Sequence, residues 1–179
     1  MSFPRVPPGS AGRQGKGSGF VLGPDEGACH WLGTPTLTTV LGSVSNGGVD
    51  VVDHPVPAGC APPRRVHRDQ DEISYLVDGE LQVVCGDDTW HGTAGSLVFL
   101  PRGIAHGFTV GADRGARALL VNAPAGFGDL IVDLGVPGAG LHLPGRGVPM
   151  PDPDRISAAS ARRGSGPAPA GAAARAGGS

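Results

Sequence analysis

Short runs of alternating apolar and polar residues, separated by turn residues, recur through the first two thirds of the chain. Dipeptides such as Asn46-Gly47 and Asp78-Gly79 lie between these runs and are typical of tight hairpin turns. Short strands at this spacing predict an all-β sandwich or barrel. The predicted strands are 20–22, 36–45, 49–56, 73–77, 80–85, 97–100, 108–110 and 116–122.

Two short helices are expected after the strands. Apolar residues recur at i, i+3, i+4 and i+7 from Phe127 to Leu134, and Gly135 follows where a helix commonly ends. A second helix is expected from Asp152 to about Arg163, because a proline and two acidic residues lie at its positive N-terminal end. The pattern therefore adds one or two helices to a β body.

The two ends of the sequence have little to bury. Residues 1–18 and 164–179 are rich in Pro, Gly, Ser and Ala, so we predict a disordered N-terminal arm and a disordered tail. Between them, residues 19–124 are expected to form one barrel domain. Residues 125–163 are expected to form a helical and linker extension that packs on the barrel.

Composition and charge narrow the class of protein. The 179 residues include 32 Gly and 18 Pro with 4% aromatic residues, which favours a turn-rich β body over a helical bundle. A net charge of −2 and the lack of a basic cluster argue against a nucleic-acid partner. No apolar run is long enough to cross a membrane, and the three cysteines form no CxxC pair. We therefore expect a cytoplasmic protein with free thiols.

Two segments, 59–79 and 95–110, carry the candidate chemistry. They supply His67, Glu72 and His106 on predicted strands. Two imidazoles and one carboxylate are the ligand set of a facial-triad metal site, which leaves positions open for substrate or oxygen. The expected cofactor is a divalent iron, nickel, manganese or zinc ion, and the ligand types alone do not choose among these metals.

Both segments resemble the two signature motifs of the cupin superfamily. The matching positions are Gly59, His67, Glu72 and Gly79 in the first motif, and Gly95, Pro101, Gly103 and His106 in the second. Segments HWLGTPTLTTV, AGFGDLIVDLG and PDPDRISAASARRG are also similar to the single-domain quercetin dioxygenase-like branch. The resemblance implies a cupin fold, a double-stranded β-helix or jelly-roll barrel, and a homodimer.

Alternation along the strands predicts which side chains share the barrel interior. Arg65 shares a face with His67, and His106 shares one with Phe108. Glu72 shares its face with Ser74 and Leu76, opposite to the face of residues 73, 75 and 77. The predicted substrate pocket consists of Arg65, Ser74, Leu76, Phe99, Phe108 and His54.

Arg65 departs from the family pattern, because the first motif has a histidine at this position. A guanidinium has no lone pair for a metal. Its side chain therefore swings away and leaves a three-ligand metal site, forms an ion pair with Glu72 in a metal-free site, or binds an anionic substrate. His54 is a candidate substitute ligand or substrate contact, although a barrel histidine more often has a structural role.

The resemblance implies a metal-dependent, dioxygenase-like enzyme that acts on a small aromatic, polyketide-like or flavonoid-like substrate of secondary metabolism. Glu72 would then be both a ligand and the general base. Ser74, where the branch often has an aromatic residue, suggests a substrate other than a flavonol. One alternative is a redox-neutral cyclase, isomerase or dehydratase, with or without a metal, in which Glu72 and His67 do acid–base work and Arg65 stabilises an enolate. The other is a non-catalytic cupin that binds a small molecule.

Overall fold

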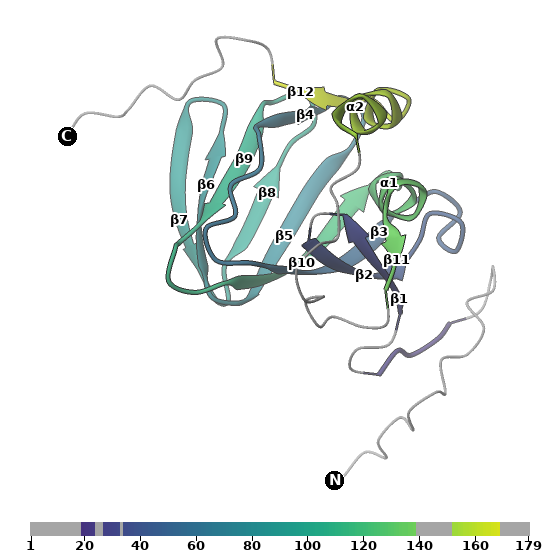
Figure 1. Ribbon diagram of the computed structural model, residues 1–179, viewed down its shortest axis with the longest axis horizontal. Coiled ribbons are helices and arrows are strands. Elements are labelled where there is room, and N and C mark those ends of the chain that lie inside the picture. Colours follow the sequence, from purple (N-terminus) through teal and green to yellow (C-terminus); the bar gives the residue numbers. More distant parts are fainter. Residues whose placement is uncertain (1–18, 24–26, 33, 139–151, 169–179) are drawn as a thin grey trace, which may run out of the picture.

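The computed structural model describes residues 19–23, 27–32, 34–138 and 152–168. Figure 1 shows two β-sheets that face each other, with two helices at one side. The strands are β1 (Ala28–Leu32), β2 (Thr34–Val40), β3 (Asp50–Val56), β4 (Arg65–His67), β5 (Asp71–Asp78), β6 (Glu80–Cys85), β7 (Asp88–Thr93), β8 (Leu97–Leu100), β9 (His106–Val110), β10 (Ala116–Ala123), β11 (Val136–Pro137) and β12 (Ser165–Pro167). The helices are α1 (Phe127–Leu134) and α2 (Pro153–Ala161).

Eight of the strands form a jelly roll of two antiparallel sheets. One sheet contains β3, β10, β5 and β8 in that order, and the other contains β4, β9, β6 and β7. Strands β2, β1 and β11 extend the first sheet beyond β3, and β12 extends the second beyond β4. This arrangement confirms the prediction of an all-β jelly-roll barrel with two short helices.

The interior has an apolar end and a polar end. The apolar end is one cluster of buried side chains: Val56, Leu76, Leu81, Val83, Cys85, Leu100, Val110 and Ala116. The turn between β5 and β6 lies beside this end and needs glycine, because Gly79 has a φ of +78° and a Cβ there would lie 2.5 Å from the Gly115 carbonyl oxygen. The polar end holds His67, Glu72 and His106, all buried.

Helix α1 packs across the barrel wall through Ile131, which contacts a second apolar cluster with Val52 and Leu120. Its N-terminus is held by Asp50, whose carboxylate accepts hydrogen bonds from the backbone N–H groups of Gly126 (2.6 Å) and Gly128 (3.1 Å). A buried carboxylate satisfies these groups where α1 has no side-chain cap of its own. The helix predicted from the apolar spacing is confirmed.

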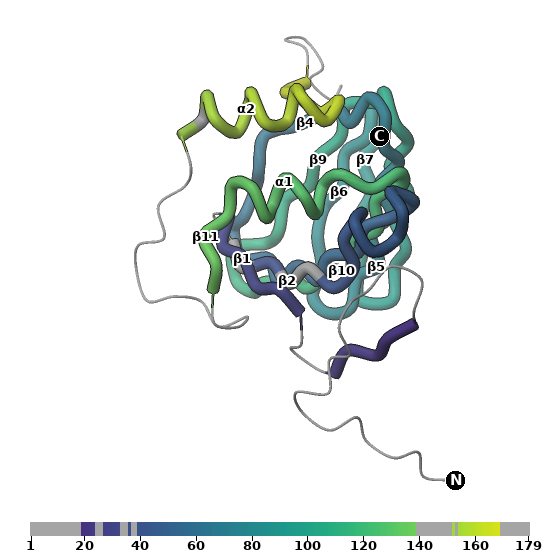
Figure 2. Tube along the Cα trace, turned by 90° about the vertical axis from the view of Figure 1, so that its right-hand side faces the viewer, coloured from purple at the N-terminus to yellow at the C-terminus, as the bar shows by residue number. Residues whose placement is uncertain are grey.

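Helix α2 lies beside α1 (Figure 2). Asp152 is its N-cap, and the Asp152 carboxylate accepts a hydrogen bond from the Asp154 backbone N–H at 2.8 Å. This helix is also confirmed and ends two residues before the predicted end at Arg163. Neither of these two helices, the only ones in the described part of the chain, has the length and apolar character that a membrane span requires.

Several predicted boundaries are wrong. Residues 20–22 form no strand, because Val21 is exposed and has no partner strand within the described ranges. The strand predicted at 36–45 ends at Val40, and turns follow it. The tail predicted to be disordered from 164 contains β12, which pairs with β4. The predicted disorder at 1–18 and 169–179 lies outside the described residues.

Candidate functional site

Three ionisable side chains from separate strands meet at the polar end of the barrel. His67 ends β4, Glu72 lies on β5 of the facing sheet and His106 begins β9. Their side chains are at most 2% exposed, and one ligand atom from each lies within 4.8 Å of the others. The Nε2 atom of His67 lies 3.3 Å from Glu72 Oε2, and that of His106 lies 3.9 Å from the same oxygen. The structure thus brings together the predicted triad.

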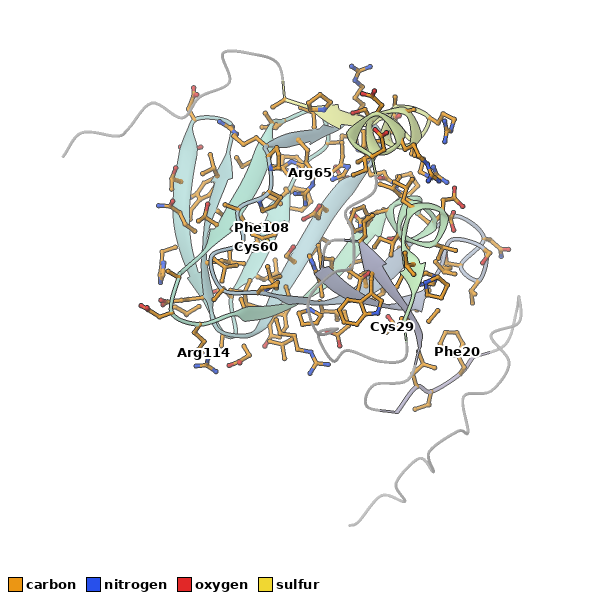
Figure 3. All side chains as sticks on the ribbon, viewed as in Figure 1. Phe20, Cys29, Cys60, Arg65, Phe108 and Arg114 are labelled. Carbon is orange, nitrogen blue, oxygen red and sulfur yellow. The ribbon has the colours of Figure 1, made fainter. Side chains whose placement is uncertain are left out.

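Arg65 enters this cluster from β4. Its Nη2 donates to the Glu72 carboxylate at 3.0 Å from Oε2, and its Nε donates to His67 Nε2 at 3.2 Å. The guanidinium carbon lies 6.0 Å from the centre of the Phe108 ring, and Figure 3 shows Arg65 and Phe108 in the space between the two sheets. Of the three conformations expected for Arg65, the structure has the ion pair with Glu72. The side chain keeps 21% of its surface exposed.

Hydrogen bonds from both ring nitrogens orient the two imidazoles. Arg65 Nε donates to His67 Nε2, and in the tautomer that accepts this bond the His67 Nδ1–H donates to Ser165 Oγ at 2.6 Å. His106 Nδ1 lies 2.9 Å from the Ile104 carbonyl oxygen, which can only accept, so this nitrogen also carries the proton. Both rings therefore present an Nε2 lone pair to the centre of the site.

The charges of the site follow from burial and from Arg65. Burial raises the pKa of Glu72, but the neighbouring charges, above all the Arg65 guanidinium, outweigh burial and hold that pKa well below its ordinary value. Burial and then Arg65 lower the pKa of His106 to about 4, and they lower the pKa of His54 on β3 to about 4. At neutral pH the site therefore combines the Glu72 carboxylate, the Arg65 guanidinium and the neutral imidazoles of His106 and His54.

A small cavity adjoins the triad. Its volume of about 20 Å³ is enough for roughly one water molecule. Most of the predicted pocket residues line it, namely His54, Ser74, Leu76 and Phe108, together with Glu72 and apolar residues that include Val98 and Leu100. Arg65, also predicted for the pocket, does not line the cavity itself but contacts two residues that do, Glu72 and Phe108.

The prediction that Phe99 lines the pocket is wrong. Strand β8 pairs with β5 so that Ser74 lies opposite Val98 and Glu72 lies opposite Leu100. Val98 and Leu100 therefore point inward with them, and Phe99 points to the outer face, where 55% of its surface is exposed.

The donor set fits a divalent metal when Arg65 moves aside. Two Nε2 lone pairs and a carboxylate face one point, and His106 Nε2 is a buried atom without a hydrogen-bond partner among the described residues. In the observed conformation, however, Arg65 donates a hydrogen bond to His67 Nε2 and forms an ion pair with Glu72. The same three donors thus serve either an ion or the guanidinium.

One residue of the site carried no signal in the sequence. Ser165 lies on β12, in a segment of Ser, Gly and Pro without apolar residues, and it reaches His67 from 98 positions further along the chain. The tail was predicted to be disordered for the same compositional reason. A strand pairing of this kind shows only in the fold.

Comparison with known proteins supports the cupin superfamily for the barrel. Residues 54–122 match the family model described as Cupin domain, and the fold is a cupin-type double-stranded β-helix. No match was found among curated proteins.

Solved structures with a similar fold have low sequence identity to this chain. The cupin domain of Schizosaccharomyces pombe Cnp3 is 13% identical with a TM-score of 0.49, over 53% of this chain and 67% of that one. The protein TT1209 of Thermus thermophilus is 27% identical with a TM-score of 0.42, over 44% and 74%. A cupin sugar phosphate isomerase of Silicibacter pomeroyi is 22% identical with a TM-score of 0.44, over 50% and 58%.

Proposed function

We propose that this protein is a cupin-type enzyme that catalyses a redox-neutral isomerisation, cyclisation or dehydration of a small molecule with an enolisable carbonyl group. The observation that supports this proposal is the position of Arg65, whose guanidinium lies between Glu72 and His67. A guanidinium donates two parallel N–H groups to an oxyanion. Removal of a proton next to a carbonyl creates such an oxyanion, which buried donors stabilise.

Glu72 is the proposed base. With Arg65 in contact, its pKa is held low and the carboxylate is a weak base. A substrate oxygen that accepts the Arg65 N–H groups separates the guanidinium from Glu72, and burial then raises the carboxylate pKa. His67 Nε2 loses its Arg65 hydrogen bond in the same step and is then able to accept and return a proton. Substrate binding would thus activate both groups together.

Substrate entry requires Arg65 to move. The cavity of about 20 Å³ does not admit an organic molecule, and Arg65 is the partly exposed member of the polar cluster. Beyond it lie Leu76, Val98 and Phe108, an apolar lining that suits an aromatic or polyketide-like substrate. The open state of the site would therefore be larger than the observed one.

Hydrogen–deuterium exchange tests this function. EDTA-treated protein in oxygen-free D₂O would be incubated with β-diketone and hydroxyketone probes, and α-proton exchange would be followed by NMR. We expect wild-type protein to catalyse exchange and Glu72→Gln and Arg65→Met to lower the rate by about 100-fold or more. Arg102→Met, which removes an exposed guanidinium paired with Asp71, is the matched control. Exchange or turnover that requires both added metal and oxygen would overturn the proposal.

The second candidate is the metal-dependent, dioxygenase-like enzyme. It is favoured by His106 Nε2, whose buried lone pair has no partner among the described residues. His67, Glu72 and His106 would hold the ion, which would supply Lewis-acid and oxygen chemistry. Ser165 and the Ile104 carbonyl would orient the two imidazoles, and Arg65 would turn toward solvent or toward an anionic substrate.

Metal titration separates the two candidates. Calorimetry with Zn²⁺, Mn²⁺ and Ni²⁺ would be performed on wild type, His106→Ala, Arg65→Met, Arg65→Met/His106→Ala and Arg102→Met. If the ion pair excludes the metal, Arg65→Met raises the affinity at least tenfold, because a neighbouring positive charge is removed and the His67 lone pair is released. Stoichiometric tight binding by the wild type, lost in His106→Ala, would favour the second candidate.

A further inference from the structure

The C-terminal strand β12 pairs with the strand that carries Arg65 and His67. Ser165 lies opposite His67 and Pro167 lies opposite Arg65 in this antiparallel pair. Two flanking backbone hydrogen bonds fix its place, one from Arg68 N–H to the Gly164 carbonyl oxygen at 2.6 Å and one from Ala168 N–H to the Arg64 carbonyl oxygen at 3.1 Å. The pairing holds Ser165 beside the triad independently of its own side chain.

The turn into β12 is also specific. Gly164 has a φ of +68°, and a Cβ at this position would overlap the Asp69 carboxylate. The chain therefore enters β12 in one conformation, which directs the Ser165 hydroxyl to the His67 ring. The Oγ–Nδ1 distance of 2.6 Å is short for a hydrogen bond between a ring nitrogen and a hydroxyl, so the contact is close.

We propose that Ser165 is a positioning residue for His67. By accepting the Nδ1 proton it selects the tautomer in which the Nε2 lone pair points at Arg65 and Glu72. The backbone carbonyl of Ile104 has the corresponding role for His106. The two imidazoles thus use different devices, a local carbonyl two residues away and a hydroxyl from a distant strand. This inference deepens the proposed function, because either chemistry of the site needs the same lone pair.

The ring nitrogens of His67 report the effect directly. Full-length protein labelled with ¹⁵N-histidine would be compared as wild type, Ser165→Ala, Ser165→Thr and Ser165→Val. Thr and Val have nearly the same shape, but only Thr retains the hydroxyl. We expect one His67 tautomer with a protected Nδ1 proton in wild type and Ser165→Thr. We expect loss of that proton signal and mixed tautomers in Ser165→Ala and Ser165→Val.

Ser157→Ala, which removes an exposed hydroxyl from α2, is the control and should leave the His67 signals unchanged. If Ser165→Val disturbs the backbone spectrum of β4, the comparison of Ser165→Ala with Ser165→Thr shows whether the hydroxyl selects the His67 tautomer. An unchanged His67 tautomer in folded Ser165→Ala overturns the proposal. The measurement needs no substrate or metal, so a failure of the proposed enzyme activity would be seen separately.

Discussion

Strands β5 and β8 carry apolar side chains on the outer face of the barrel wall, where polar side chains are usual. The inner face of β5 carries Glu72 and Ser74 before it reaches Leu76, whereas the outer face carries Ile73, Tyr75 and Val77. Tyr75 and Val77 are exposed and Glu72 is fully buried. The more apolar face is therefore the one turned away from the interior.

Strand β8 shares the exposed apolar outer face, although its inner residues Val98 and Leu100 are apolar too. Leu97 and Phe99 lie opposite Tyr75 and Ile73 in the β5–β8 pair and are exposed. Burial of apolar side chains alone therefore does not explain which face of β5 and β8 points into the barrel. Two interior groups hold the inner faces: the polar cluster, where Glu72 meets Arg65 and the two imidazoles, and the apolar cluster with Leu76 and Leu100. Substitutions on the two faces should therefore have unequal effects.

The largest difference is expected between Glu72→Gln and Tyr75→Ser. Loss of the Glu72 charge leaves the Arg65 guanidinium without its anion inside the barrel, so the free energy of unfolding should fall by about 4 kcal/mol. Tyr75→Ser on the outer face should change it by less than about 1 kcal/mol. Urea unfolding at pH 7, followed by circular dichroism, measures both values. Equal losses would show that the inner network does not orient the wall.

A smaller contrast is expected between two neighbours on β8. Leu100→Ala creates a cavity in the apolar cluster of the interior and should lower the free energy of unfolding by about 3 kcal/mol. Phe99→Ala removes a larger side chain from the outer face and should cost less than about 1 kcal/mol. The same urea experiment applies. A larger effect at Phe99 would mean that this face is covered in solution.

The smallest effect is expected from pH. The His54 pKa is lowered to about 4 in the folded protein, so between pH 6.5 and 4 the unfolded chain binds the proton more readily. Neutral His54 contributes fully to the free energy of unfolding above pH 6.5. This contribution decreases as the pH falls, by roughly 1.5 kcal/mol between pH 6.5 and 5. His54→Asn should therefore lose less stability over this range than wild type does. Parallel curves for the two proteins in urea titrations at these pH values would contradict this assignment.

Motif spacing predicted much of the site because each spacing reflects a strand or a turn. Since alternate residues share a face, His67 and Glu72 also predicted the inward position of Arg65 and of Ser74. Phe99 was misplaced because the segment Leu-Val-Phe-Leu has no alternation, and its inward residues follow from the pairing with β5. The conformation of Arg65 depends on partners in both sheets, so the sequence left three alternatives open.

The contact between residues 67 and 165 has a consequence for how the protein is made. The two residues are 98 positions apart, and at about 5–20 residues per second a ribosome needs roughly 5–20 s to add that length. Once β10 has been added, the nascent barrel can collapse around its apolar end while the His67 ring still lacks its hydroxyl partner. The site would thus be completed only after residue 165 has been added, when most of the barrel already exists.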